Sequence, residues 1–369
     1  MLNLMQHKLN KNIAHIALGI GPTSCVYNEH FLPVIDLNTR LIVFGGNKGY
    51  DHGDQIIYCH CSAVRFYRAL ISMMKLGYVF NVHFVHLSAL MIFLSPFFTK
   101  IIKVRRRTVV TMHTSWPNYK CINKIYFLIS CIFYTKIIFC SKTSYGSNPR
   151  WVKILIGKKY EIIENGLNIS RLDRSKLSKS LYLNKNIFNG TNKNLVVSCG
   201  RLVKSKGFDI VIKAFGELCM KDTILVIVGD GPEIEDLKDM AIKLKSGKDI
   251  VFCGQMERDQ LYKMLNFCNF YISASVVEGL PVALLEAMAA RCFPILTDIP
   301  QHLDVVPRRN AEYFKKGSVE SAANALKKAL AYSEIHKSKI LDENRFIAES
   351  KFAHEKMLEK YYKVYQKVN

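Results

Sequence analysis

Acidic residues are scarce in the first half of this sequence of 369 residues. Residues 1–190 hold 25 Lys and Arg against 7 Asp and Glu, whereas residues 191–369 hold 27 against 23. A half so poor in acids is expected to face an anionic partner, which could be a lipid headgroup surface, a phosphorylated ligand or nucleic acid. The alternative is a basic surface that serves solubility only.

Uninterrupted apolar runs are also missing. The two most apolar stretches, residues 78–98 and 121–140, are broken by polar and charged side chains such as Asn81 and Lys136. A membrane-spanning helix needs about 20 consecutive apolar residues. We therefore expect buried strands and helices here, beginning with a strand at residues 79–86, and no transmembrane helix.

Closely spaced cysteine pairs are lacking as well. The 11 cysteines are scattered, and only Cys59 and Cys61 lie close together, without the second pair that a zinc site of this kind requires. We expect reduced cysteines and no metal. The N-terminus also lacks the charged start, apolar core and cleavage site of a secretory signal, which favours a cytoplasmic location.

Short β-rich runs alternate with helical patterns along the chain. Such alternation is typical of parallel sheets with helices on both faces, so the fold class is α/β. Residues 170–194 interrupt the alternation with a polar stretch rich in Ser, Lys and Asn. We expect a first doubly wound domain over residues 1–175, a linker over 176–193, a second doubly wound domain over 194–350 and a closing amphipathic helix over 351–369 at the domain junction.

Glycines and cations follow the predicted strands of the second half. Ligands of open parallel sheets bind at the carboxyl ends of the strands, where glycine lets the backbone approach a ligand closely. Successive strand ends there carry Gly200, Gly229 with Gly231, Gly254 and Gly279, and the first turn adds Arg201 and Lys206.

The stretch SVVEGLPVALLEAMAA, residues 275–290, predicts the start of an apolar helix. Pro281 fits the first helical position, because its missing N–H would be unpaired there. The free N–H groups of that turn, with Gly279 and Leu280 before it, form a site for an anion such as a diphosphate. Arg201 and Lys206 would supply the positive charge.

Two carboxylates in this stretch need partners. Glu278 stands just before the expected helix and Glu286 inside it, and a buried carboxylate is costly unless something satisfies it. Pairs of sugar hydroxyls on either side of a diphosphate could donate hydrogen bonds to these carboxylates. The transferred sugar would then bind to Glu278 and a ribose to Glu286. The alternative is that Glu286 only pairs with a buried Lys or Arg.

These residues resemble a known family. The runs SCGRLVKSKGFDIVIKAF, VIVGDGPEIEDL, VFCGQ, YISASVVEGLPVALLEAMAA and FPILTDIPQHLDVV, between residues 195 and 306, closely resemble the C-terminal domain of the retaining glycosyltransferases of family four, also called group 1. The spacing of Glu278 and Glu286 is that family's signature. The resemblance is looser in the first half, at TMHTSW (111–116), IIFCSKTS and IIENGLNISRL. It implies the GT-B fold, in which two Rossmann-like domains face a cleft and a C-terminal helix crosses back.

The resemblance also implies the roles of individual residues. It implies retaining, metal-independent transfer of a hexose from a nucleotide sugar, by family preference a UDP-sugar. The implied catalytic residues are Glu278, His113, Arg201 and Lys206. The implied donor-binding residues are Gly200, Arg201, Lys206, Gly229, Gly231, Gly254, Glu278, Gly279, Leu280, Pro281 and Glu286.

Two departures from the family pattern stand out. The usual Gly-Gly loop after the first strand is replaced by GIGPTSCVYNEHF, in which Gly19 and Gly21 are candidates for a phosphate loop, and Arg291 occupies a position that is commonly glycine. For His113 a purely structural role is the alternative. His83 is expected to be structural.

The basic first half then has a candidate partner. Lys100, Lys103, Arg105, Arg106 and Arg107 lie among apolar residues and are expected to contact an anionic membrane on its cytoplasmic side. We expect a lipid-linked saccharide as the acceptor, in the biosynthesis of a lipopolysaccharide or another cell-surface polysaccharide. The alternatives are a soluble transferase with a small phosphorylated or carbohydrate acceptor and, from another class, a non-catalytic nucleotide-sugar or nucleic-acid binding protein. No nucleic-acid recognition motif is found, so no nucleic-acid partner is expected.

Overall fold

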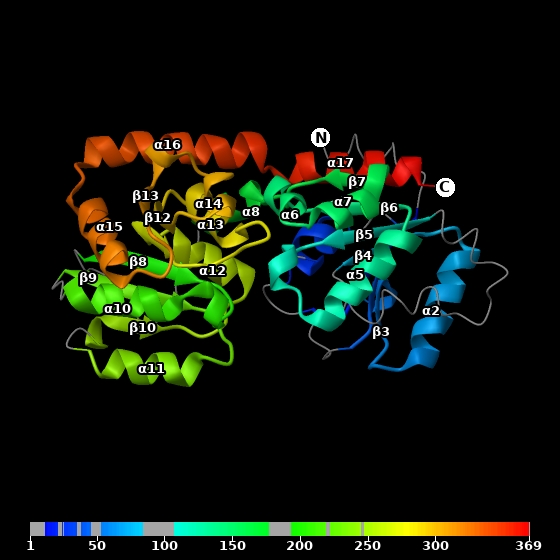
Figure 1. Cartoon of the computed structure of the whole chain (residues 1–369), viewed down its shortest axis with the longest axis horizontal. Helices are drawn as coiled ribbons and strands as arrows, with labels where there is room; N and C mark the ends of the chain where they lie inside the picture. Colours follow the sequence, from blue (N-terminus) through cyan, green and yellow to red (C-terminus); the bar gives the residue numbers. More distant parts are fainter. Residues whose placement is uncertain are drawn as a thin grey trace. The chain divides into compact units, whose positions relative to one another are not determined.

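The chain is made of two compact units, seen in the computed structural model of Figure 1. The structure describes residues 12–20, 24, 26–34, 38–45, 53–83, 107–176, 193–218, 222–244 and 247–368. The first unit combines residues 1–166 with residues 354–369, and the second comprises residues 167–353.

The first unit is built on a parallel sheet. Its described strands follow the order β3-β2-β1-β4-β5-β6-β7. Most of these strands are buried on both faces, which explains their nearly continuous apolar sequences. The strands are β1 (Ile13–Ala17), β2 (Thr39–Val43), β3 (Ile56–Tyr58), β4 (Val79–His83), β5 (Thr108–Met112), β6 (Lys136–Phe139) and β7 (Tyr160–Ile162).

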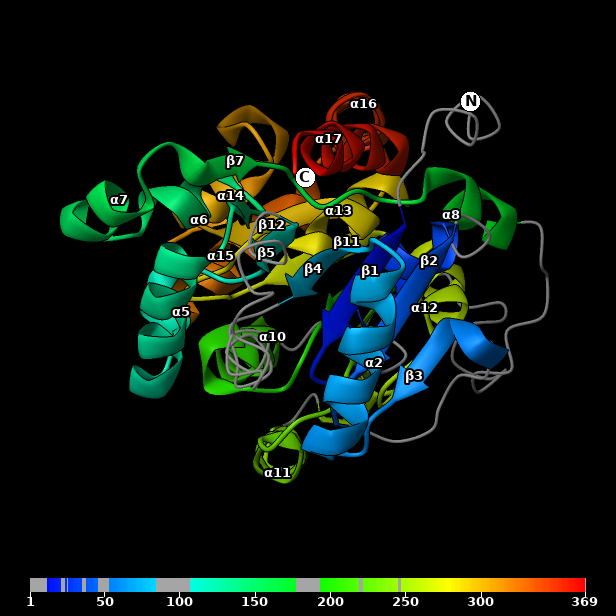
Figure 2. The ribbon, with the colours of Figure 1, turned by 90° about the vertical axis from the view of Figure 1, so that its right-hand side faces the viewer.

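Helices cover both faces of this sheet. On one face, Phe66 of α2 (Ala63–Lys75) and Phe127 of α5 (Cys121–Phe133) pack in a core with alternate strand residues such as Ile16. On the other face, Leu358 and Tyr361 of α17 (His354–Lys367) pack with Val79 and its neighbours. Figure 2 shows α2 lying across the strands and α17 on the other side of the sheet. The unit also contains η1 (Val26–Phe31), α6 (Lys142–Gly146) and α7 (Arg150–Ile156).

The second unit holds another parallel sheet. Its described strands follow the order β10-β9-β8-β11-β12-β13, namely β8 (Asn194–Cys199), β9 (Thr223–Val228), β10 (Ile250–Phe252), β11 (Phe270–Ser273), β12 (Phe293–Thr297) and β13 (Glu312–Phe314). The helices are α8 (Ile169–Lys176), α10 (Phe208–Leu218), α11 (Ile234–Ile242), α12 (Arg258–Leu265), α13 (Val282–Ala289), α14 (Pro300–Leu303), α15 (Val319–Ala331) and α16 (Glu334–Lys351). The predicted doubly wound arrangement is thus found in both units.

The division of the chain differs from the expected one at both ends of the second unit. The first unit ends at Gly166 and not at residue 175, because α8 packs on α12 and α13 and its Asp173 forms an ion pair with Arg345 of α16. The closing helix begins at His354 and completes the core of the first unit. Most of the expected linker, residues 177–192, lies outside the described residues.

The two apolar stretches form ordinary elements of the first sheet where they are described. The first contributes β4, and its residues 84–98 lie outside the described residues. The second forms α5 and β6, as predicted. Among the helices that the structure describes, none has the length and apolar character needed to cross a bilayer.

Candidate functional site

Lys206 and Glu278 meet at the carboxyl end of the second sheet. Lys206 lies in the turn after β8 and Glu278 in the loop after β11, and these two strands are neighbours. The Lys206 Nζ atom is 2.6 and 2.8 Å from the two carboxylate oxygens of Glu278. Ser275 Oγ donates a further hydrogen bond of 2.7 Å to Glu278 Oε1. The pair is therefore held in a fixed geometry, which suits a preorganised binding site.

A cavity of about 170 Å³ opens beside this pair. Its walls come from the end of β8, the start of α10, the β11 loop and the first turn of α13. Of the predicted site residues, it is lined by Gly200, Lys206, Glu278, Leu280 and Pro281. Its size fits part of a nucleotide sugar, and its polar groups are those predicted for the diphosphate and the sugar.

Glu286 lies on α13 but does not line this cavity. Its side chain is 1% exposed, and its Oε1 accepts a hydrogen bond from Nη1 of Arg258, which is itself buried at the start of α12. Glu286 thus has a buried base as a partner, as the alternative requires, and its role in ribose binding stays a prediction.

The glycine turns of the second unit pack on one another. A side chain on Gly229 would stand 1.9 Å from the carbonyl oxygen of Gly200, and one on Gly231 would stand 2.3 Å from that of Leu202. Gly229 N donates to Gly254 O at 2.8 Å. Gly229, Gly231 and Gly254 do not line the cavity. Close backbone packing between turns thus requires glycine at positions 229 and 231 in this structure, and their role in donor binding stays a prediction.

The start of α13 lies one residue later than predicted. Pro281 is the N-cap, with Val282 as the first helical residue, and its carbonyl accepts hydrogen bonds from Leu284 N and Leu285 N. At the other end, Arg291 adopts a left-handed conformation with φ of 67°, which explains why glycine is common at this position. The departure at Arg291 changes a turn, as expected.

The remaining predicted cations and glycines that the structure describes take no part in the cavity wall. Arg201 is exposed in the turn after β8, and Gly19 is exposed after β1. Arg107 immediately precedes β5. Gly21 and the basic residues Lys100, Lys103, Arg105 and Arg106 lie outside the described residues.

His113 follows β5 in the first unit and is surrounded by other histidines. Its Nε2 is 2.9 Å from Nδ1 of His83, the last residue of β4. The Nε2 of His83 is in turn 2.9 Å from Nδ1 of His15 in the middle of β1. Burial lowers the pKa of His113 to about 4 and that of His15 to about 3, so both are neutral near pH 7.

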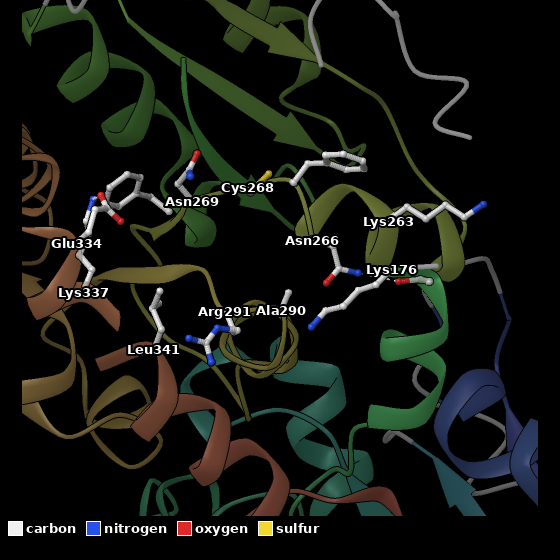
Figure 3. A pocket seen from close by; sticks show the side chains of 13 residues that line it. Lys176, Lys263, Asn266, Cys268, Asn269, Ala290, Arg291, Glu334, Lys337 and Leu341 are labelled. Atoms are coloured by element: carbon white, nitrogen blue, oxygen red, sulfur yellow. Dashed lines mark hydrogen bonds and ion pairs between the residues drawn. The ribbon is translucent and has the colours of Figure 1, made fainter. Parts of the chain in front are cut away.

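A larger cavity than the one beside Lys206 and Glu278 lies elsewhere in the second unit. It measures about 400 Å³ and contains none of the predicted site residues. Residues just before β11 and β12, such as Asn269 and Arg291, line it, which puts it at the amino end of these strands. Figure 3 shows the side chains of Lys176 and Asn266 directed toward this cavity and that of Lys263 directed away. Ligands of such sheets bind at the opposite, carboxyl end, so the smaller cavity is the better donor site.

Three features of the sites were not predicted from the sequence. Ser275 supports Glu278, and its own carbonyl accepts a hydrogen bond of 2.7 Å from Thr297 Oγ1. Arg258 could have been sought as the base that Glu286 needs, yet nothing in its local sequence marks it as buried. The grouping of His15 with His83 depends on strand order, which single-sequence patterns do not reveal.

Solved structures define the class of fold. A structure of Anabaena HepE with UDP and glucose superimposes with a TM-score of 0.77 at 16% identity, covering 96% of this chain and 100% of that one. The sucrose-phosphate synthase of Thermosynechococcus elongatus gives a TM-score of 0.75 at 15% identity over 97% and 98% of the two chains. Together with the two parallel sheets, these likenesses show that the chain has the GT-B fold.

A family model matches the second unit. Residues 183–347, less than half of the chain, match the family described as "Glycosyl transferases group 1". This confirms the resemblance predicted from the motifs.

Two curated relatives each match less than half of the chain. The GPI3 subunit of phosphatidylinositol N-acetylglucosaminyltransferase from Saccharomyces cerevisiae is 26% identical over 157 residues, 42% of this chain and 34% of that protein. A Campylobacter jejuni N-acetylgalactosaminyltransferase named for a diphospho-undecaprenol substrate is 28% identical over 141 residues, 38% of this chain and 35% of that protein. The chain thus spans about a third of the length of these curated relatives.

Proposed function

We propose that this protein is a retaining glycosyltransferase that moves a sugar from a UDP-sugar to a lipid-linked saccharide in cell-surface polysaccharide biosynthesis. The observation that carries the proposal is the Lys206–Glu278 pair at the mouth of the cavity beside β8 and β11. The family match of the same unit and the UDP-containing structural neighbour support it.

The chemistry needs positive charge where the leaving group becomes negative. The bond between the anomeric carbon and the diphosphate breaks, a bond from the acceptor oxygen forms on the same face, and the hydroxyl proton passes to the leaving phosphate. The Lys206 ammonium has three N–H donors, of which Glu278 takes at most two, so a phosphate oxygen can accept another. With Arg201 in the same turn, these groups would stabilise the leaving diphosphate without a metal at this site.

Nucleotide binding tests the donor site. UDP and UDP-sugars are expected to raise the melting temperature of the wild-type protein, because a ligand bound only by the native state stabilises it. Lys206→Gln should largely abolish this shift, whereas Lys204→Gln, in the same turn but exposed, should keep it. Equal shifts in the two variants would refute the assignment of Lys206.

The acceptor proposal draws on the surface formed by α5 and α7, which pack against each other. Apolar side chains on these helices are unusually exposed: Ile125 is 52%, Trp151 54% and Ile154 74% exposed. Residues 107–160 contain nine Lys and Arg and no Asp or Glu. Of these cations, Lys136 forms an ion pair with Glu161. Exposed apolar side chains among an excess of cations fit the interface of an anionic membrane. This supports a peripheral position on the inner face of the cytoplasmic membrane.

Vesicle flotation tests this part separately from donor binding. The wild-type protein is expected to float with vesicles containing anionic lipid and not with zwitterionic ones, and added salt should weaken the binding. The variant Trp151→Ser/Ile154→Ser should lose flotation and keep its response to UDP. Ile335→Ser on α16, where the residue is 87% exposed, is the matched control. Failure of the wild type to bind anionic vesicles would favour the soluble transferase with a small acceptor.

A further inference from the structure

Four histidines gather in the first unit. His15 lies in β1, His30 in η1, His83 at the end of β4 and His113 just after β5. The His30 and His83 rings have their centroids 4.6 Å apart, and those of His83 and His113 are 5.2 Å apart. Elements far apart in the sequence therefore bring several imidazoles to one place.

Three of these imidazoles can direct nitrogen atoms to a common point. One ligand nitrogen from each of His30, His83 and His113 lies within 4.8 Å of the others. The Nε2 atom of His30 is buried and has no hydrogen-bond partner among the residues that the structure describes. An unsatisfied buried nitrogen is costly and points to a missing partner.

His30 and His113 are neutral near pH 7. Burial lowers the pKa of His113 to about 4, and burial together with the neighbouring His113, His15 and His354 lowers that of His30 well below its usual value. Near pH 7 these rings are neutral and each keeps a lone pair, which is the form that coordinates metals.

We propose that His30, His83 and His113 bind one divalent transition-metal ion of the zinc class. His83 Nδ1, His113 Nε2 and His30 Nε2 would be the ligand atoms. The first two are 2.9 Å apart, close to the roughly 3.3 Å between ligand nitrogens when zinc–nitrogen bonds are about 2.0–2.1 Å. The other nitrogen of His83 then donates to His15 Nδ1, the kind of outer hydrogen bond that orients a metal-bound imidazole.

The donor set decides the class of metal. Imidazole nitrogens suit zinc, copper, nickel and cobalt, whereas magnesium and calcium prefer oxygen, and no carboxylate or cysteine joins this group in the described part of the chain. Three protein ligands leave a fourth position for water or another molecule. The inference departs from the expectation that the chain binds no metal. It also gives His113 a role other than the catalytic one that the family resemblance implies, while the donor-site residues Lys206 and Glu278 belong to the second unit.

Metal content tests the site without reference to activity. The full chain, stripped with chelator, incubated with Zn²⁺ and desalted, should retain about one ion per chain by elemental analysis, a count that follows from one three-histidine site. Co²⁺ should give the intense visible absorption of four-coordinate cobalt, and Zn²⁺ should displace it. His30→Gln should lose both signals, whereas His336→Gln, an exposed histidine of α16, should keep them.

Two controls keep the outcome clear. Circular dichroism and the UDP-induced melting shift report whether His30→Gln is folded and whether the second unit works. Should that variant fail to fold, the wild-type cobalt spectrum and zinc content decide by themselves. The proposal is overturned when the wild type retains no zinc, or when His30→Gln retains as much as the wild type. Loss of UDP binding alone would count against the proposed function and not against this site.

Discussion

The buried pair of Arg258 and Glu286 offers the sharpest test of what Glu286 does. Both side chains are almost fully buried, at 5% and 1% exposure, and each neutralises the other. Arg258→Met removes the base and leaves a buried carboxylate without its ion-pair partner. Glu286→Leu leaves the buried guanidinium without its ion-pair partner. The variant Arg258→Met/Glu286→Leu removes both charges and keeps apolar volume.

The expected magnitudes follow from burial. Breaking a buried ion pair by removing one partner costs about 3–5 kcal/mol, whereas replacing both partners by apolar residues is often neutral. For a domain of this size about 3–5 kcal/mol corresponds to a fall in melting temperature of roughly 6–20 °C. We therefore expect the melting temperature of each single variant to fall by that amount, and the melting temperature of the double variant to lie close to that of the wild type.

Thermal unfolding, followed with and without UDP, measures both roles of Glu286. A single variant Arg258→Met that unfolds within about 1 kcal/mol of the wild type would refute the ion-pair reasoning. When the double variant is stable and still responds to UDP as the wild type does, Glu286 serves only as a partner for Arg258. When it is stable and no longer responds, the ribose role implied by the family resemblance is supported.

Three further predictions concern single groups. Glu278→Gln should lower kcat/KM by about 10–100-fold, because a hydrogen bond to a charged group contributes about 1.5–3 kcal/mol, and an unchanged value would remove Glu278 from the site. Arg291→Gly should raise the free energy of unfolding by roughly 0.5–1 kcal/mol, because glycine adopts the left-handed backbone conformation without strain and only an exposed ion pair with Asp342 is lost. The variant Asp342→Asn measures the contribution of that ion pair separately. A lower free energy of unfolding for Arg291→Gly would contradict the reasoning. The free energy of unfolding should fall as the pH drops from about 6.5 toward 4, by roughly 1.4 kcal/mol per pH unit for each buried histidine such as His15 or His113. In this pH range the histidines are protonated in the unfolded chain, whereas their lowered pKa keeps them neutral in the folded protein. Urea titrations of the wild type and His15→Gln at several pH values test this, and parallel curves would argue against it.

Local patterns predicted most of the second unit because they agree with its tertiary structure. The alternation of strands and helices that was expected in this half of the chain is found from β8 to β12. The elements β13, α15 and α16 were not predicted. The three-residue strand β13 carries too little alternation to detect.

The sites divide in a similar way. Lys206 and Glu278 could each be predicted as site residues because each follows a strand of one parallel sheet and ligands bind at that edge. Their ion pair was not predicted, because it depends on the strand order. The role of Arg258 as the partner of Glu286 was not predicted, because the burial of its charged side chain depends on packing between α12 and α13, which no local sequence pattern indicates. The proximity of His30 to His83 likewise depends on the path of η1, a π-helical turn with no periodic signature.

The helix α17 has a consequence for how the protein is made. Leu358, Tyr361 and Tyr365 fill one face of the first sheet, yet the ribosome must synthesise residues 167–353 before it reaches them. At about 5–20 residues per second, this takes roughly 10–40 s. During that time strands such as β1 and β4 lack the helix that covers them in the folded state. The nascent chain is therefore expected to recruit chaperones until its last helix leaves the exit tunnel.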